Sequence, residues 1–253
     1  MKTVTLILTL LLSSIFVALP VLSVEKGLVA YWGFNEGEGD TTEDLSGNGH
    51  DGKLMGDPQW TDGYFGGGLE FDQEGDEVNI PFHENLNLDT FTVTAWANVE
   101  PGSSGHRAVV SSRDEPPVSG YIFYAEPPAG NTWIFITGGG GWKWIRGPVV
   151  NAGKWDHLAG TFANGKMNFY VNGNHIGETD SEISLNTKQE FLIGAGANER
   201  ATHEYLFKGK IDEVRVYDRE LSEDEIASVM ESDTAPVEPA GKLATTWANL
   251  KAR

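Results

Sequence analysis

The segment DLSGNG carries oxygen-bearing side chains at every second position. Asp44, Ser46 and Asn48 occupy positions 1, 3 and 5 of a loop that has a glycine at position 6. This is the first half of an EF-hand-like calcium loop, in which alternate side chains curl around one centre. The acid expected at position 12 is replaced by Met55, so the loop is not an EF-hand. Its remaining carboxylate ligands must come from elsewhere in the chain.

Asp212 is the carboxylate that best completes such a site. It lies in the strand-like run GKIDEVRVY, where side-chain alternation puts it on the same face as Val214 and Val216. A carboxylate on a buried face is costly unless it is paired, hydrogen-bonded or bound to a metal. Glu36, in NEGEG, is a second candidate. The sequence therefore predicts Ca²⁺ bound by Asp44, Ser46, Asn48, Glu36 and Asp212, since calcium takes six to eight oxygens.

Both acids also have an interpretation without metal. Asp44 is a typical residue of an Asx-turn, and Asp212 could accept hydrogen bonds from backbone N–H groups of the 44–52 loop. Zinc is not expected, because the chain has no cysteine and its six histidines have no close metal-ligand spacing.

A second candidate site is aromatic. In NTWIFITGGGGWKWIRG, Trp133 shares a strand face with Phe135, and Trp142 shares a face of the next strand with Trp144. Flat rings suit the apolar face of a pyranose, and Arg146 and Asn131 could contact its hydroxyl groups. The alternative is that these rings fill the core, which is the common position of Trp in strands. The other strand tryptophans, Trp32, Trp96 and Trp155, are assigned to the core.

Composition and the first residues limit the possible partners. The chain has 253 residues and a formal net charge of −19, which argues against nucleic acid and anionic membrane surfaces. Residues 1–23 have a basic start at Lys2, an apolar stretch and a helix-breaking Pro20, as in a secretory signal peptide. Cleavage after about Ser23 predicts a product that is secreted or lies in the periplasm or cell envelope, with no membrane insertion. An uncleaved membrane anchor is the alternative.

Short alternating runs separated by Gly and Asn turns fill residues 27–217 and predict an all-β fold. About a dozen such strands indicate an antiparallel two-sheet jelly-roll sandwich. Two Asn-Gly pairs, at 164–165 and 172–173, predict tight hairpins. Residues 73–76 read as a hairpin-like turn between GLEFD and EVNIPF.

A short helix is expected after the last strand, over residues 221–230. Ser222 and Glu225 have the spacing of a capping box. Residues 231–241 read as an acidic linker, and residues 242–253 as a short amphipathic tail with Trp247 on its apolar face. The tail is either a frayed terminus or a docking peptide for a protein partner.

Ordered motifs give the chain a family resemblance. GLVAYWGFNEGEG, DLSGNGHDGKL, PQWTDGYFGGGLEFD, FTVTAWANV, WDHLAGTF with FYVNG, and GKIDEVRVYDRELSEDEI follow one another along the sequence. In this order they resemble a laminin-G-like jelly-roll domain of the concanavalin A-like lectin/glucanase superfamily. The resemblance covers residues 24–230 and is strongest over 90–226. It implies a sugar-binding or adhesion module, often with calcium. Many relatives have a disulfide near the domain end, which a chain without cysteine lacks.

The motifs of catalysis are absent from the sequence. Glucanase relatives carry E-x-D-x-x-E on one strand, and no such triplet occurs; Asp212 and Glu213 point to opposite strand faces. The sequence therefore predicts an exported, non-enzymatic module that recognises an extracellular glycan or glycoprotein with calcium support. One alternative is a structural or adhesion protein that docks through its tail. A glycoside hydrolase or lyase is the other.

Overall fold

The structure is a computed structural model that describes residues 26–126, 131–196 and 205–232. The expected signal peptide (1–23), most of the linker and the tail (242–253) lie outside the described residues. No helix within the described ranges has the length and apolar character needed to span a bilayer.

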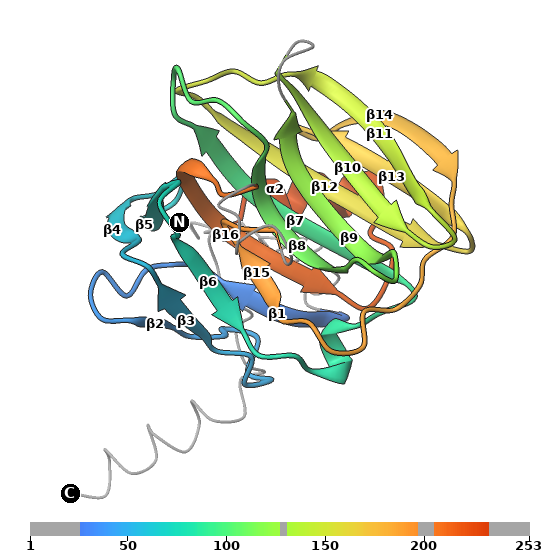
Figure 1. Cartoon of the computed structure of the whole chain (residues 1–253), viewed down its shortest axis with the longest axis horizontal. Coiled ribbons are helices and arrows are strands. Elements are labelled where there is room, and N and C mark those ends of the chain that lie inside the picture. The colour runs from blue at the N-terminus through green and yellow to red at the C-terminus, as the bar shows by residue number, and fades with distance from the viewer. Residues whose placement is uncertain (1–25, 127–130, 197–204, 233–253) are drawn as a thin grey trace, which may run out of the picture.

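Two antiparallel sheets form a jelly-roll sandwich, as the sequence predicts (Figure 1). The first, sheet A, has the order β14-β13-β12-β7-β16-β5-β4, with β1 also paired to β16. The second, sheet B, has the order β11-β10-β9-β8-β15-β6-β3-β2. The strands of sheet A are β1 (Leu28–Trp32), β4 (Gln59–Asp62), β5 (Gly67–Asp72), β7 (Phe91–Val99), β12 (Trp155–Ala163), β13 (Lys166–Val171), β14 (Asn174–Asp180) and β16 (Lys208–Tyr217). Those of sheet B are β2 (Thr41–Thr42), β3 (Gly52–Met55), β6 (Glu77–Ile80), β8 (Arg107–Asp114), β9 (Ser119–Glu126), β10 (Thr132–Gly138), β11 (Trp142–Val149) and β15 (Phe191–Ile193).

Aromatic side chains join the inner faces of the two sheets. Trp32 of β1 stacks on Phe191 of β15 with ring centroids 5.2 Å apart. The rings of Phe135 on β10 and Phe169 on β13 meet at a tilt, with centroids 6.0 Å apart. Gly160 on β12 leaves the space that the Phe135 ring needs, because a Cβ there would lie 2.7 Å from it. The core is therefore a continuous layer between the sheets.

Of the three tryptophans that the sequence assigns to the core, Trp32 and Trp96 are buried, and only Trp32 lies between the two sheets. Trp96 is buried on the outer face of sheet A, where Tyr64 stacks on it at 3.4 Å. Trp155 is half-buried beside the same tyrosine. A surface loop, rather than the second sheet, shields these two rings.

The predicted hairpin at residues 73–76 is wrong. β5 belongs to sheet A and β6 to sheet B, so the turn crosses from one sheet to the other. The carboxylate of Asp76 stabilises this crossing, because it accepts hydrogen bonds from the backbone N–H groups of Asp57 and Asp72. A local sequence of this kind fixes a turn but does not fix the partner of each strand.

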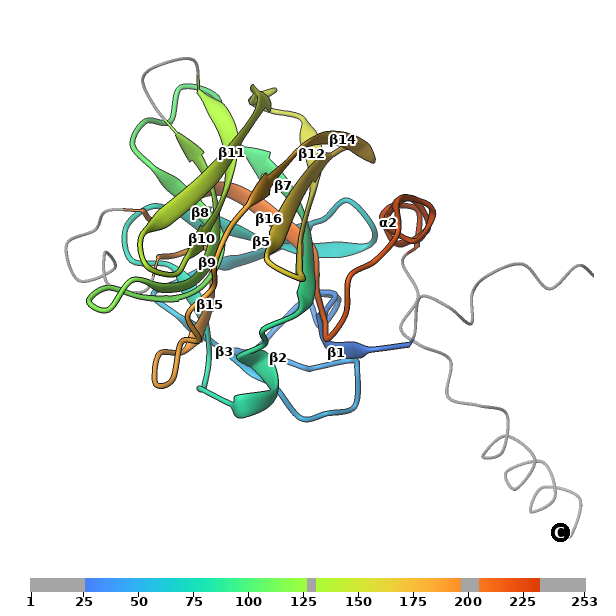
Figure 2. The same cartoon turned by 90° about the vertical axis from the view of Figure 1, so that its right-hand side faces the viewer.

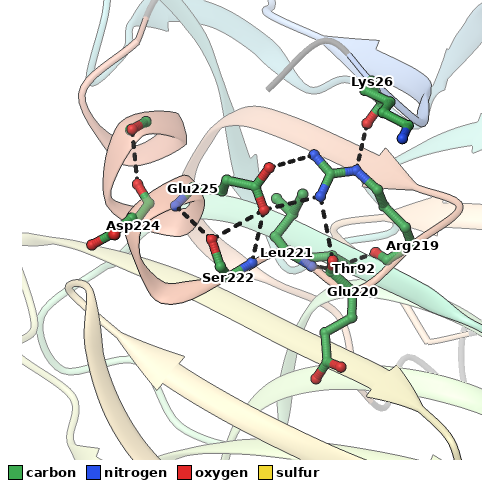
Figure 3. A network of polar contacts seen from close by, with 9 residues as sticks. Lys26, Thr92, Arg219, Glu220, Leu221, Ser222, Asp224 and Glu225 are labelled. Atoms are coloured by element: carbon green, nitrogen blue, oxygen red, sulfur yellow. Dashed lines mark hydrogen bonds and ion pairs between the residues drawn. The ribbon is translucent and has the colours of Figure 1, made fainter. Parts of the chain in front are cut away.

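The C-terminal helix forms where the sequence places it. Helix α2 (Glu223–Met230) begins after Ser222, which forms the predicted capping box with Glu225 (Figure 3). The guanidinium of Arg219 donates to both Glu225 oxygens and lowers the pKa of that carboxyl to about 2. Ile226 and Val229 of α2, with Leu221 just before the helix, pack on Tyr217 of the outer face of sheet A. Figure 2 shows α2 on the side of the molecule away from β9 and β10. A short 3₁₀ turn, η1 (Glu84–Leu86), links β6 to β7.

Candidate functional site

The Asp44 carboxylate organises its own loop through hydrogen bonds to the chain. It is 4% exposed. One oxygen accepts from the N–H groups of Tyr31 and Ser46, and the other accepts from the His50 N–H and the Ser46 hydroxyl. The bond from Ser46 N–H two residues on is the Asx-turn arrangement. Four donors therefore already surround this carboxylate.

The other residues of the predicted calcium loop also bond to nearby backbone. Ser46 and Asn48 both donate to the Val29 carbonyl on β1. A Glu36 oxygen accepts from the Thr42 hydroxyl and the Glu43 N–H. These bonds tie the 36–50 loop to itself and to β1.

Asp212 serves a different loop. One of its oxygens accepts from the N–H groups of Tyr64 and Phe65, at 2.9 and 3.0 Å, and the other from the Glu213 N–H. Burial raises the pKa of Asp212 to about 7, while these three backbone bonds act in the opposite direction. Asp212 and Asp44 share no hydrogen-bond partner.

Sequence reasoning predicted that the Asp212 carboxylate is satisfied by backbone N–H groups or by metal. The first holds, with the 63–66 turn in place of the 44–52 loop. Within residues 26–126, 131–196 and 205–232, no three His, Asp or Glu side chains are grouped to hold a metal ion. Asp44, Ser46 and Asn48 lie together, since the Ser46 hydroxyl is 2.9 Å from an Asp44 oxygen and 3.1 Å from the Asn48 amide nitrogen, whereas Asp212 bonds to another turn. Calcium stays a prediction.

Two of the predicted sugar-binding residues are placed elsewhere. Trp133 is fully buried in the core, where its indole N–H donates to Asp156 at 2.8 Å, so its assignment to a sugar site is wrong. Both faces of β10 are apolar, and alternation alone does not decide which one turns inward. The Asn131 amide oxygen accepts a hydrogen bond from the Arg107 guanidinium. Asn131 does not line the surface hollow in which Trp142 and Trp144 lie, as far as its lining is described.

A hollow of about 330 Å³ opens on the outer face of sheet B, over β8 to β11. The strand register places its lining side chains in rows that run across β9, β10 and β11. Trp144 of β11 lies opposite Ile136, which lies opposite Ile122 on β9. Arg146 lies opposite Ile134 and then Tyr124 in the same way. The β9 and β10 side chains form an apolar floor, and β11 forms one wall.

Trp142 and Trp144 give this wall two kinds of aromatic surface. Trp142 is half-buried, its indole N–H donates to Glu115, and the Arg113 guanidinium lies 5.3 Å from its ring centroid. Trp144 has 53% of its surface exposed. Arg146 beside it forms an ion pair with Glu126. The hollow therefore combines the anchored Trp142 ring and the exposed Trp144 ring with charged groups that can form hydrogen bonds.

Sequence reasoning missed most of this lining. Tyr124 and Glu126 follow from alternation along β9 once β9 is known to pair with β10. Glu115 lies in the loop after β8, and Tyr205 lies in the loop before β16. The ring centroid of Tyr205 is 5.6 Å from the Arg113 guanidinium carbon. No local pattern marks these two residues, because only the fold brings them to the hollow.

The described chain is a two-sheet jelly roll with an aromatic hollow on one outer face. The family described as the concanavalin A-like lectin/glucanases superfamily matches residues 72–227. The chain belongs to this family. No curated protein matches the chain.

Solved structures share the fold at low sequence identity. Domain 4 of AbnA, a GH43 extracellular arabinanase from Geobacillus stearothermophilus solved with arabinotriose, has a TM-score of 0.63 and 21% identity, over 80% of this chain and 97% of that one. The binding domain of Paraclostridial Mosquitocidal Protein 1 has a TM-score of 0.65 and 18% identity, over 81% of this chain and 52% of that one. The binding domain of botulinum neurotoxin DC, solved with SialylT, has a TM-score of 0.63 and 14% identity, over 83% of this chain and 52% of that one. The chain spans about half the length of the two toxin binding domains.

Proposed function

We propose that this protein is an exported, non-enzymatic module that binds an extracellular glycan in the hollow of sheet B. The observation that carries the proposal is the exposed Trp144 ring beside the anchored Trp142 ring, above an apolar floor. Concave sites with apolar walls and a few placed polar groups are the usual form of small-ligand sites. A sugar presents both an apolar ring face and hydroxyl groups, and therefore matches both parts.

The solved relatives support a binding role. The arabinanase domain was solved with arabinotriose, and the toxin domains are named as binding domains. Export rests on the sequence of residues 1–23, and a protein partner for residues 242–253 rests on the sequence alone. Calcium is not part of this proposal, because the predicted ligands already make hydrogen bonds within the chain.

Two carboxylates in the hollow require the enzyme alternative to be considered. Glu115 accepts from the Trp142 indole and lies 3.7 Å from an Arg113 nitrogen, and Glu126 pairs with Arg146. A glycosidase acid needs a setting that keeps its proton, such as an apolar pocket. Both carboxylates instead lie beside guanidinium groups, which supports binding without hydrolysis.

The test is affinity measurement on a panel of soluble polysaccharides by gel electrophoresis, followed by calorimetry on the best oligosaccharide. Trp144→Ala is expected to weaken binding by about 10- to 100-fold, since exposed aromatic anchors carry much of a binding energy. Val149→Ala is the matched control, because Val149 is 60% exposed on the same strand and does not line the hollow. Binding that survives Trp144→Ala would place the ligand elsewhere and overturn the proposal.

The same samples test catalysis. Incubation of wild-type protein with the bound oligosaccharide is expected to release no new reducing ends. Release that Glu115→Gln or Glu126→Gln abolishes would establish an enzyme and overturn the non-enzymatic assignment.

A further inference from the structure

We infer that the hollow selects neutral glycans and discriminates against anionic ones such as uronates, sulfated sugars and sialylated sugars. This inference rests on the proposed function, because it names the ligand class of the same site. It comes from how the charges in the hollow are arranged, and from the charge of the whole chain.

The charges that line the described part of the hollow cancel in pairs. Arg113 lies beside Glu115, with a nitrogen and an oxygen 3.7 Å apart, and Arg146 is ion-paired with Glu126. The described lining has no other charged side chain. It therefore presents both hydrogen-bond donors and acceptors without a net positive charge.

The arginines are arranged to orient hydroxyl groups more than to attract anions. Arg113 is 5% exposed and is covered by the Trp142 and Tyr205 rings. Arg146 is more open, with 48% of its side chain exposed, but Glu126 lies against it. An anionic group that approached Arg146 would come next to the Glu126 carboxylate, and the repulsion between them would offset the attraction. A sugar hydroxyl can donate to Glu126 and accept from Arg146 at the same time.

The net negative charge of the whole molecule also disfavours anionic glycans. A formal charge of −19 gives the surface a negative potential that lowers the local concentration of anions, most strongly at low ionic strength. A site for anionic glycans on such a chain would need a patch of uncompensated Arg or Lys, and this hollow has none in its described lining.

Paired probes test the inference. Affinity electrophoresis compares the full chain on hydroxyethylcellulose and carboxymethylcellulose, dextran and dextran sulfate, and galactan and polygalacturonate. At about 50 mM NaCl, the wild type is expected to bind at least one neutral member, and to bind its anionic counterpart at least about tenfold more weakly. The neutral affinity should change less than about twofold between 50 and 500 mM NaCl, because no ion pair with the ligand is formed.

A charge variant separates discrimination from simple loss of binding. Glu126→Gln leaves Arg146 without its carboxylate and is expected to improve binding of the anionic counterpart by about fivefold or more, an improvement that is lost at about 500 mM NaCl. Glu178→Gln makes the same change in net charge on β14, where Glu178 pairs with Lys166 away from the hollow, and should leave the discrimination unchanged.

The outcomes distinguish the two proposals. Wild-type binding of an anionic glycan as tightly as its neutral counterpart, with loss in Trp144→Ala, overturns the inference and leaves the proposed function intact. Unchanged discrimination in Glu126→Gln also overturns the inference. No binding to any probe, neutral or anionic, overturns both.

Discussion

The indole of Trp142 lies over Gly138, the residue opposite it on β10. A Cβ built on Gly138 would stand 2.5 Å from the Cζ3 atom of that ring. Only a glycine permits so close an approach of ring to backbone. The last residue of β10 therefore sets the position of one of the two tryptophans in the hollow.

Gly138→Ala is expected to displace Trp142, because the new Cβ would clash with the indole ring and break its hydrogen bond to Glu115. Glycan binding should weaken by about tenfold. Calorimetry with the oligosaccharide chosen from the panel measures the change. Gly177→Ala on β14 is the matched control, since a Cβ there meets Ile145 at an ordinary 3.6 Å. Full affinity in Gly138→Ala would show that the Trp142 position does not matter for binding.

Trp133→Phe tests the correction of the predicted site. The substitution removes the buried bond from Trp133 to Asp156 and leaves a gap in the core, so the free energy of unfolding should fall by about 1–3 kcal/mol. Chemical denaturation measures this loss. Glycan affinity of the folded variant should equal that of the wild type. An affinity loss without a stability loss would return Trp133 to the binding site.

Asp212→Asn tests whether this carboxylate acts through hydrogen bonds or through calcium. The amide keeps one acceptor oxygen for three backbone donors, so stability should fall by about 1–3 kcal/mol. The loss is expected to be the same with millimolar calcium and with EDTA. Asp180→Asn is the control, because that side chain is 91% exposed. A loss that disappears in EDTA would support the predicted metal site instead.

His157 should make the protein sensitive to acid. Its ring is buried on the outer face of sheet A, and neither ring nitrogen has a hydrogen-bond partner among the described residues. Burial lowers its pKa to about 3. Between pH 6.5 and about 3 the unfolded chain binds a proton that the native chain does not. Stability should therefore fall as pH falls through this range, by up to about 1.4 kcal/mol per pH unit from this residue.

Denaturation of wild type and His157→Gln between pH 7 and 4 isolates that contribution. The variant should lose stability less steeply. Asp212, whose pKa is raised to about 7, has an effect of opposite sign that is common to both proteins and cancels in the comparison. Equal slopes in the wild type and His157→Gln would mean that His157 takes up its proton in the native state as readily as in the unfolded chain, and would contradict the prediction.

Elements with local causes could be predicted from the sequence. The hairpins at Asn164 and Asn172 form where Asn-Gly predicts them, with φ of 53° and 52° at the two asparagines. The cap of α2 forms because its two partners are three residues apart. Trp142, Trp144 and Arg146 could be grouped because alternation on one strand puts them on one face.

The sequence by itself determined the β class, the turns, the capped helix and the pairing of Trp142 with Trp144, since each depends on residues close together in the chain. Only the tertiary structure decided that Trp133 turns into the core, that Asp212 bonds to the turn after β4, and that Glu115 and Tyr205 meet β11 at one hollow. The physical reason is that a strand's faces are equivalent until a second layer covers one of them. Partners from distant segments meet only after the sheets have packed.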